Sequence, residues 1–233
     1  MEAKEKASFS SERLYLHLLG AFPGLVHDFD AKWKNWQAAI SSSPSQSEWS
    51  SGLEFAALTA LGPKVIPLVV YKLALKPDDA TAVYLYNILE KDAEFRAPPN
   101  SSSDPEAAGR AILQKNFDRN RQVRNTLADW EEHCARVSSF STSAFYTNCE
   151  EFEQLLSYGC SIIPHIMLEY KKKDWPIFGY ELLHKLVWGC HTGLQSVGLD
   201  DEYRLWAEWF ENKNHDEAPH YRGPGTFQTR TDA

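Results

Sequence analysis

The sequence predicts an all-α fold, a HEAT-like array of helices built on an internal duplication with capping helices around it. Three observations lead to this prediction. Apolar residues recur mainly at three- and four-residue spacings along the 233 residues, whereas the alternation typical of strands is scarce. Stretches rich in Ser, Pro and Gly divide the chain into helical segments. Finally, the segment at about 52–89 recurs at about 149–186.

The N-terminal part predicts a helix that carries Trp33 and Trp36 three residues apart, so that both side chains share one face. A loop rich in Ser follows at 41–45, and the first repeated unit begins after it. Within that unit a first helix can end at Gly62, and Pro63 can open the second helix, where its missing N–H costs nothing. A third apolar helix completes the unit.

The second unit keeps the register of the first. At an offset of 97 residues, nine positions are identical, and they include a Gly and a Pro that chance seldom places in register. Each unit has an apolar face that it cannot bury alone, so we expect the two units to stack. The identical pairs are Glu54/Glu151, Phe55/Phe152, Leu58/Leu155, Gly62/Gly159, Ile66/Ile163, Pro67/Pro164, Lys76/Lys173, Leu85/Leu182 and Leu89/Leu186.

A long helix over 105–137 joins the units, between a flexible connection at 97–103 and a Ser-rich stretch at 138–143. A last helix at about 200–211 precedes a polar tail, 212–233, whose Pro and Gly residues predict an extended or frayed chain. Residues 1–211 are thus expected to form one helical domain. The apolar face of the long helix comprises Ile112, Leu113, Val123, Leu127, Trp130 and Cys134.

Composition excludes several classes of protein. The formal net charge of −8 argues against a generic nucleic-acid binder but allows a local basic patch. Hydrophobic residues at 43% argue against intrinsic disorder, and no apolar run approaches the length of a membrane span. The N-terminus lacks the apolar stretch of a signal peptide, so we expect a cytoplasmic protein. Because no phosphate loop, dinucleotide fingerprint or C-x-x-C pair occurs, we expect neither a cofactor nor a metal.

The long helix carries the strongest candidate for RNA contact. Between residues 110 and 124, five basic residues face a single acid, Asp118, in a chain that is acidic overall. A helix with this charge can follow a phosphate backbone, and the alternative is an ordinary solvated helix surface. The five residues are Arg110, Lys115, Arg119, Arg121 and Arg124.

The last predicted helix carries the opposite charge. Asp200, Asp201 and Glu202 occupy its first turn, and Trp206 and Trp209 follow at helical spacing. Carboxylates beside aromatic faces are the partners that a guanidinium prefers, which predicts a pocket for a cationic ligand. The alternative is that acids in the first turn serve only to stabilise the helix dipole.

Glu181 and His184 lie three residues apart, a spacing that lets both side chains reach one point. Dimetal carboxylate bundles need this motif twice, and the equivalent positions of the first unit are Tyr84 and Asn87, so we predict no metal there. The functional interpretation is a general base, His184, assisted by Glu181 or Asp174. The alternative is a histidine satisfied within the core.

Three patterns stand out along the chain: E-F-x-x-L-x-x-x-G-x-x-x-I-P in two copies, E-L-L-H-K-L-V-W-G at 181–189, and W-x-x-W-F-E-N-K at 206–213 leading to E-A-P-H-Y at 217–221. Together they resemble a group of small fungal proteins linked to biosynthetic gene clusters, and within it the arginine-containing cyclodipeptide synthases. That family is associated with a D-D-x-x-E motif, whereas here Asp200 and Asp201 are followed by Glu202, Tyr203 and Arg204.

The resemblance implies that arginine arrives as an ester on tRNA, that the amine of a second amino acid attacks this ester, and that a second aminolysis closes the diketopiperazine ring. Its partners would be an aminoacyl-tRNA and an amino-acid substrate. On this hypothesis the candidate residues are His184, Glu181, Asp200 and Asp201 for catalysis, Trp206, Trp209 and Glu202 for substrate binding, and Arg110, Lys115, Arg119, Arg121 and Arg124 for tRNA.

Two other hypotheses stay open. A helical array can be a non-catalytic repeat module that binds a protein or peptide partner on its concave face. Alternatively, the chain is an unrelated biosynthetic enzyme in which His184 is the base. Metabolite profiling of an expressing host tests the first hypothesis directly, because it detects product formation and product identity together.

Overall fold

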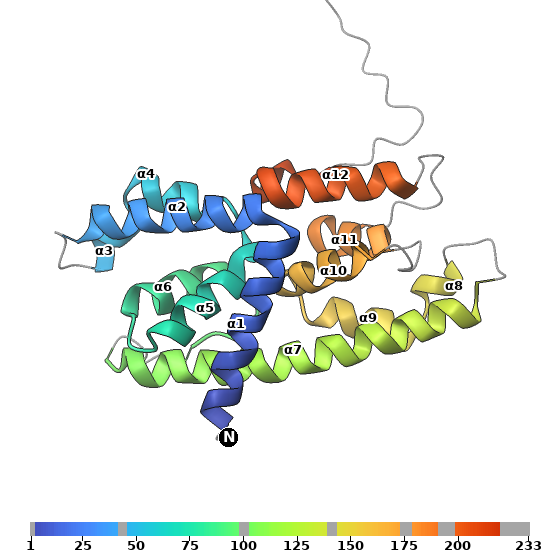
Figure 1. Cartoon of the computed structure of the whole chain (residues 1–233), viewed down its shortest axis with the longest axis horizontal. Coiled ribbons are helices and arrows are strands. Elements are labelled where there is room, and N and C mark those ends of the chain that lie inside the picture. The colour runs from blue at the N-terminus through green and yellow to red at the C-terminus, as the bar shows by residue number, and fades with distance from the viewer. Residues whose placement is uncertain are drawn as a thin grey trace, which may run out of the picture.

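The prediction of an all-α fold is confirmed, since every regular element among the described residues is a helix (Figure 1). The computed structural model describes residues 3–41, 46–97, 103–138, 144–172, 179–190 and 199–219. The α-helices are α1 (Ala3–Ala21), α2 (Pro23–Ile40), α3 (Gln46–Trp49), α4 (Leu53–Thr59), α5 (Ile66–Leu75), α6 (Ala80–Leu89), α7 (Pro105–Arg136), α8 (Ala144–Thr147), α9 (Glu150–Ser157), α10 (Ile163–Tyr170), α11 (Gly179–Trp188) and α12 (Leu199–Asn212). Three 3₁₀ helices are η1 (Pro63–Val65), η2 (Cys160–Ile162) and η3 (His215–Glu217).

The long helix α7 lies along one side of the molecule, and the two predicted units lie over its two halves (Figure 1). Helices α5 and α6 pack on its N-terminal part, and α9 packs on its C-terminal part. Helix α1 crosses α7 and also contacts α5 and α10. Helices α2 and α12 cover the opposite side, where they contact each other. Helix α7 therefore lies along both predicted units, in the bridging position that the sequence predicts.

The two units have the same order of elements at the predicted offset. Helix α4, η1, α5 and α6 correspond to α9, η2, α10 and α11, and η2 starts and ends 97 residues after η1. Pro67 and Pro164 both lie in the first turn of their helices, where proline disrupts nothing. One detail differs from the prediction, because Pro63 opens the 3₁₀ turn η1 and the α-helix begins only at Ile66. A common origin of the two units stays a prediction.

A glycine occupies the turn between the first two helices of each unit. Gly62 has φ 73° and ψ −167°, and Gly159 has φ 70° and ψ −172°. L-residues rarely adopt this conformation, so both positions require glycine. At Gly62 there is a second reason, since a Cβ atom added there would lie 2.4 Å from the Cβ atom of His215, whereas the space beside Gly159 is open.

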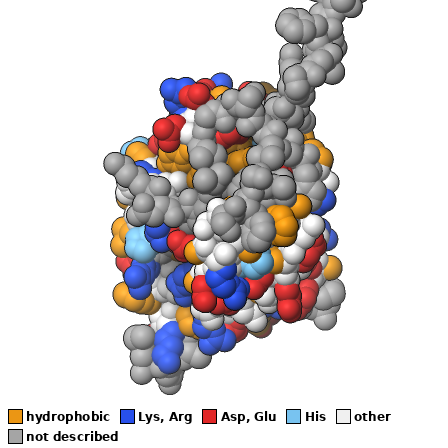
Figure 2. Space-filling view, turned by 90° about the vertical axis from the view of Figure 1, so that its right-hand side faces the viewer, with side chains coloured by type: hydrophobic (Ala, Val, Ile, Leu, Met, Phe, Trp, Pro, Cys, Tyr) orange, Lys and Arg blue, Asp and Glu red, His pale blue; other side chains and the backbone are white. Residues whose placement is uncertain are grey.

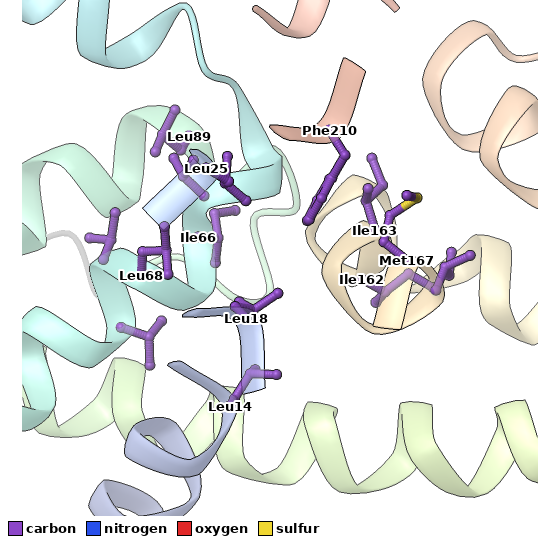
Figure 3. Close-up of a cluster of buried hydrophobic side chains, with 14 of the residues drawn as sticks. Leu14, Leu18, Leu25, Ile66, Leu68, Leu89, Ile162, Ile163, Met167 and Phe210 are labelled. Atoms are coloured by element: carbon purple, nitrogen blue, oxygen red, sulfur yellow. The ribbon is translucent and has the colours of Figure 1, made fainter. Parts of the chain in front are cut away.

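One apolar cluster connects both units. Leu14 and Leu18 of α1 lie between Ile66 of the first unit and Met167 of the second (Figure 3). Phe210 of α12 closes the same cluster from the opposite side (Figure 3). The units also touch directly, because η1 contacts both η2 and α10. The two predicted units are therefore in contact, and α1 and α12 cover the apolar cluster that they share.

Helix α7 begins and packs as its sequence predicts. The Asp104 carboxylate accepts a hydrogen bond from the Ala107 N–H at 2.9 Å and so caps the helix, and Pro105 occupies the first turn. All six residues predicted for the apolar face are buried. At the far end, the Trp130 indole N–H donates to the Tyr146 carbonyl at 2.8 Å and fastens α8 to α7.

The polar tail begins later than predicted. After α12 ends at Asn212, the chain turns through η3, and the His215 N–H donates to the Ala60 carbonyl at 2.8 Å. Ala218 is buried, and Asn214 and Glu217 form a capping box. The prediction of a frayed chain from residue 212 is therefore wrong for 213–219, because a partner distant in sequence holds this segment. Residues 220–233 lie outside the described residues.

Lys64 is the residue of the first unit that fixes this turn. Its side chain is fully buried, and its Nζ donates to the carbonyls of Trp209 at 2.9 Å, Phe210 at 3.1 Å and Lys213 at 2.6 Å. Trp209 and Phe210 lie in the last turn of α12, where helix carbonyls run out of partners within the helix, and Lys213 directly follows the helix. The Trp209 carbonyl also accepts the Lys213 N–H at 3.1 Å. Burial lowers the pKa of Lys64 to about 7, while the carbonyls and the Trp209 ring, 4.5 Å from Nζ, favour the ammonium.

Candidate functional site

Two carboxylates are buried between α11 and α12. Glu181 of α11 is 1% exposed and Glu202 of α12 is 6% exposed. Burial raises the pKa of Glu202, and the neighbouring charge of Glu181 raises it further. Among the described residues, no Lys, Arg or His forms an ion pair with Glu202. The structure thus brings together two of the acidic residues that the sequence singled out, in surroundings where burial and like charge disfavour ionisation of Glu202.

Phenol groups surround these carboxylates. Tyr170, the last residue of α10, packs its ring on that of Tyr203 with centroids 5.2 Å apart. Burial raises the pKa of Tyr170, and Glu202 contributes in the same direction. Burial likewise raises the pKa of Tyr180 to about 12, with further contributions from Glu181 and Glu202. The phenols therefore stay protonated at neutral pH and can donate hydrogen bonds within the cluster.

His184 and Trp206 join the same cluster. Both side chains are buried, and their ring centroids are 4.9 Å apart with an interplanar angle of 87°. The Trp206 indole N–H is buried and has no hydrogen-bond partner among the residues that the structure describes. We define the carboxylate cluster as Glu181, His184, Glu202 and Trp206, with the tyrosines Tyr170, Tyr180 and Tyr203 around them.

The other predicted residues of α12 point elsewhere. Trp209 is buried, but its indole N–H donates to the Asn214 carbonyl at 2.9 Å and its ring receives Lys64, so it serves the C-terminal turn. Asp200 is exposed, and Asp201 is exposed and paired with Arg204 one turn later. The helical repeat places these two aspartates on the outer face of α12. The structure therefore does not bring Asp200, Asp201 or Trp209 into the carboxylate cluster.

A groove of 780 Å³ lies between α1, α7 and α10. Arg13 of α1 and Arg124 of α7 line it, and neither forms an ion pair with any other described residue. Lys171 and Lys172 line it at the end of α10. Lys171 donates to the Ala21 carbonyl at 2.7 Å, and Lys172 pairs with Glu169, the acidic residue of the lining. We call this surface the basic groove.

Among the buried residues that line the basic groove, His165 is the polar one, beside Leu14 and Leu127. His165, at the register of Leu68 in the first unit, forms a hydrogen bond of 3.0 Å with the Asn120 side-chain oxygen, so its ring nitrogen donates. Burial lowers the pKa of His165 to about 3, and the nearby charges of Arg124 and Arg119 act in the same direction. Because the His165 imidazole is neutral, the positive charge of the groove comes from the arginines and lysines that line it.

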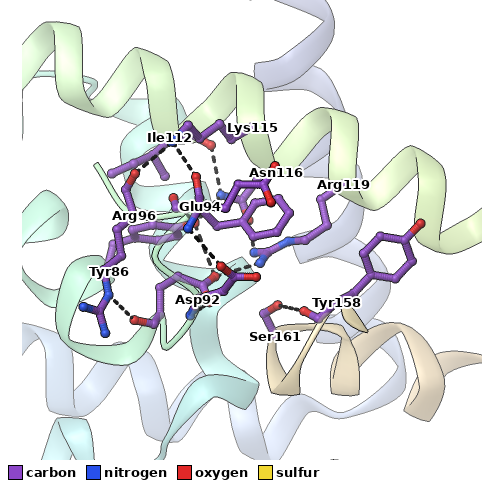
Figure 4. Close-up of polar contacts among 12 residues, drawn as sticks. Tyr86, Asp92, Glu94, Arg96, Ile112, Lys115, Asn116, Arg119, Tyr158 and Ser161 are labelled. Carbon is purple, nitrogen blue, oxygen red and sulfur yellow. Dashed lines mark hydrogen bonds and ion pairs between the residues drawn. The ribbon is translucent and has the colours of Figure 1, made fainter. Parts of the chain in front are cut away.

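Only one of the five basic residues predicted to contact RNA lines this groove, namely Arg124. Arg119 is 2% exposed and forms an ion pair of 2.7 Å with Glu90, and its second nitrogen donates to Asn116 at 2.6 Å (Figure 4). Asn116 in turn donates to the buried Tyr86 hydroxyl at 2.8 Å. The prediction that Arg119 contacts RNA is therefore wrong, because the acid that neutralises it follows α6, outside the helix on which the prediction was made.

Lys115 also has a local role. Its Nζ donates to the carbonyls of Glu94 at 2.6 Å and Arg96 at 3.0 Å, and so holds the segment after α6 against α7 (Figure 4). Arg110 is exposed and pairs with Glu106, and Arg121 is exposed and pairs with Asp118 at 3.6 Å. These three residues lie outside the lining of the basic groove.

The end of α10 connects the basic groove to the carboxylate cluster. Tyr170 packs against Tyr203 beside Glu202, and the next two residues, Lys171 and Lys172, line the groove. Figure 2 shows the end of the molecule that lies at the right of Figure 1, beside α8 and α11. Where its side chains are visible, acidic and basic groups are interspersed, and no area of a single charge covers it (Figure 2).

Arg13 and His17 of α1 also line the groove, although the sequence did not predict them as site residues. No local pattern marks them, because they join Arg124 only through the crossing of α1 over α7. Lys171 and Lys172 belong to a run of three lysines, 171–173, and cations at this place also stabilise a helix C-terminus. Lys173 of that run and Asp174, the alternative partner of His184, lie outside the described residues.

Comparisons with known proteins return no relative: no family model matches the chain, and no match is found among curated proteins or solved structures. Within the described part of the chain, no single helix is long and apolar enough to cross a bilayer. One pair of consecutive helical segments has the length and composition of a membrane span when the two are counted together, namely Leu53–Thr59 and Pro63–Leu75. The two segments meet at an angle of 83°.

Proposed function

We propose that this protein is a tRNA-dependent synthase that joins arginine, delivered as aminoacyl-tRNA, to a second amino acid in a cyclic dipeptide. The observation that carries the proposal is the junction at the end of α10, where a basic groove adjoins a buried carboxylate cluster. An aminoacyl-tRNA needs both surfaces, because its polyanionic backbone ends in an amino acid. For arginine that amino acid carries a cation.

The basic groove suits the phosphate backbone. Arg13 and Arg124 are not neutralised by other described residues, so both guanidinium groups are available to phosphate oxygens. Lys171 adds a third charge while its Nζ also donates to a backbone carbonyl. This concentration of positive charge occurs in a chain whose formal net charge is −8. A local binding site for an anionic ligand explains such a contrast.

The carboxylate cluster suits the guanidinium of the substrate. Burial of Glu202 beside Glu181 makes a second negative charge unfavourable there, and a bound cation removes this penalty. The face of Trp206 and the surrounding tyrosines supply aromatic surfaces on which a guanidinium can stack. The proposal therefore keeps Glu181, Glu202 and Trp206 from the sequence prediction and drops Asp200, Asp201 and Trp209.

The reaction needs a base near the ester. The amine nitrogen of the second amino acid attacks the ester carbonyl carbon, the C–N bond forms, and the bond to the tRNA ribose oxygen breaks. The proton lost by the amine passes to a base and then to the leaving oxygen. His184, one turn from Glu181 on α11, is the proposed base. Because aminoacyl-tRNA is used in the cytoplasm, the proposal places the protein there.

The test is metabolite profiling of a bacterial or yeast host that expresses the full chain. We expect arginine-containing cyclic dipeptides in the extract, and at least tenfold less of them from Glu202→Gln, because a charge-assisted hydrogen bond contributes about 1.5–3 kcal/mol. Glu208→Gln is the matched control, since Glu208 is exposed on the same helix. Soluble wild-type protein without any such product, or equal loss in both variants, would refute the proposal.

The proposed binding of tRNA is tested with a second matched pair of variants, both on α7. Arg124→Glu should weaken binding of aminoacyl-tRNA about tenfold and flatten its salt dependence, because a phosphate contact is lost. Arg110→Glu makes the same change of charge about 21 Å along the helix, outside the groove, and should bind as the wild type does. If neither variant affects RNA binding while a protein or peptide is retained on the array, the non-catalytic repeat module is the correct interpretation.

A further inference from the structure

We propose that His133, Cys149 and Glu151 form a Zn²⁺ site that ties the C-terminal end of α7 to the start of α9. Each of these residues offers one ligand atom, and the three atoms lie within 4.8 Å of one another. All three side chains are partly exposed, so an ion can reach them from solvent. The site is independent of the basic groove and of the carboxylate cluster, and it does not depend on the proposed function.

The ligand atoms are close to the separation that zinc requires. Zn–S and Zn–N bonds of about 2.3 and 2.0 Å at tetrahedral angles place neighbouring ligand atoms roughly 3.3–3.6 Å apart. From separations of up to 4.8 Å, the three groups must therefore close by about 1 Å. Rotation of partly exposed side chains accomplishes this without moving the helices.

The imidazole is already oriented for a metal. His133 Nε2 lies 2.9 Å from the Phe145 carbonyl oxygen, which only accepts hydrogen bonds, so Nε2 carries the proton. The lone pair then resides on Nδ1, which is free to coordinate. A hydrogen bond from the second ring nitrogen to a backbone carbonyl is the usual way in which proteins orient a metal-binding histidine.

The thiol can be released without leaving a buried group unsatisfied. Cys149 donates a weak hydrogen bond of 3.7 Å to the Tyr146 carbonyl. The same carbonyl accepts the stronger bond of 2.8 Å from the Trp130 indole, so Tyr146 keeps a partner when the thiol turns to the ion. Burial raises the pKa of the Cys149 thiol to about 11, so the ion must displace its proton to solvent. Cys149 is also the N-cap of α9, where the helix dipole favours the thiolate.

The ligand types identify the ion. One thiolate, one imidazole and one carboxylate form a borderline-soft set that suits Zn²⁺, whereas Mg²⁺ and Ca²⁺ prefer oxygen ligands. Three protein ligands leave the fourth tetrahedral position for water. The sequence contains no zinc motif here, because His133 and Cys149 are separated by 15 residues. The packing of α8 and α9 on α7 brings them together.

The test is a titration of the purified full chain with Zn²⁺ in competition with a chromophoric chelator, and with Co²⁺ as a spectroscopic probe. We expect one equivalent to bind and the Co²⁺ complex to show a thiolate-to-cobalt charge-transfer band with the intense visible bands of tetrahedral coordination. Cys149→Ser keeps an N-capping group but removes the thiolate, so it should fold normally, lose the charge-transfer band and bind Zn²⁺ at least tenfold more weakly.

Matched variants separate this site from adventitious binding. Glu151→Gln should weaken binding, whereas Glu150→Gln, one residue earlier and exposed, should not. Cys190→Ser removes an exposed thiol elsewhere and should leave both affinity and spectrum unchanged. Absence of Zn²⁺ binding by the wild type, or a Cys149→Ser protein that retains the affinity and the cobalt spectrum, would overturn the proposal.

Discussion

The two units have the same order of helices and 3₁₀ turns but differ in the polar side chains at equivalent positions. At equivalent positions of their third helices, the first unit has Tyr84 and Asn87, and the second has Glu181 and His184. Asn87 is used structurally, since its side-chain oxygen accepts the Ala97 N–H at 2.9 Å. Glu181 and His184 instead lie in the carboxylate cluster. The difference teaches that the buried acid and histidine of the carboxylate cluster belong to the second unit, whereas the equivalent positions of the first unit serve its own packing.

The turns between first and second helices show the same division. Lys64 of the first unit inserts into the end of α12, whereas Ser161 at the same register donates only to the Tyr158 carbonyl, at 3.2 Å within its own unit. Gly62 receives His215 at close range, and Gly159 faces open space. The first unit therefore holds the C-terminal segment in place, and this segment continues the helix that carries Glu202.

The largest effect is expected from exchanging Lys64. Lys64→Met should lower the free energy of unfolding by about 3 kcal/mol or more, because the carbonyls of Phe210 and Lys213 lose this donor, and buried acceptors left unpaired cost about 1–3 kcal/mol each. The Trp209 carbonyl keeps the Lys213 N–H as a partner. Ser161→Ala should cost about 1 kcal/mol or less, since it removes one weak hydrogen bond. Urea denaturation measures both.

Equal losses in these two variants would show that the units contribute alike and would remove the asymmetry described above. Circular dichroism at low urea concentration is the necessary control, because the Lys64→Met protein must retain its helical content for the comparison to hold. A loss confined to α12, seen as faster amide exchange there, would still support the role assigned to Lys64.

A comparable effect is expected at Gly62 and a smaller one at Gly159. Gly159→Ala should cost about 2 kcal/mol, the strain of placing an L-residue at φ 70°. Gly62→Ala should cost about 1–3 kcal/mol more, because its new Cβ meets His215. The difference between the variants measures the close approach, since the backbone strain is common to both.

A double-mutant cycle isolates that contact. In a chain that already carries His215→Gly, both the Cβ atom and the ring that obstruct Gly62 are gone, so the cost of Gly62→Ala should fall toward that of Gly159→Ala. Thermal and urea denaturation give the four free energies. An unchanged difference between the two alanine variants in this background would mean that His215 is not the obstacle.

The sequence predicted those features of the fold that depend on neighbours along the chain. The buried face of α7, the cap and proline at its start, and the glycine turns all follow from local spacing and from backbone preference. The ordered turn at 213–219 does not follow from local sequence, since the lysine that holds it, Lys64, lies far away in the chain, in the first unit. A buried Lys also resembles an ordinary surface Lys until its distant partners are known.

The same limit applies to the candidate site. Arg119 and Arg124 lie on one helix and have the same chemistry, yet the first is buried with Glu90 and the second lines the basic groove. Only the packing of α6 and α1 against α7 separates them. On α12, helical spacing does distinguish Glu202 and Trp206 from Asp200 and Asp201, and a stricter use of that spacing could have placed the two aspartates outside.

The smallest effect is expected from Glu202, and its pH dependence is the sharpest test of the second unit. Because burial and Glu181 raise the pKa of Glu202 in the folded state, folding favours its protonated form. That contribution is fully present below the ordinary pKa of 4.5 and is lost as pH rises through the raised value. Glu202→Gln, which imitates the protonated form, should therefore raise Tm by about 3 °C at pH 7.

The difference in Tm between Glu202→Gln and wild type should shrink as pH falls toward 4.5, since the wild-type carboxyl group then takes up its own proton. Glu208→Gln, on the exposed face, should show no such trend. Differential scanning calorimetry across this pH range distinguishes the cases. A Glu202→Gln variant that is more stable at neutral pH yet forms less product would show that the Glu202 charge destabilises the fold and serves the reaction. A Tm difference that stays constant at every pH would show that ionisation of Glu202 does not destabilise the folded state.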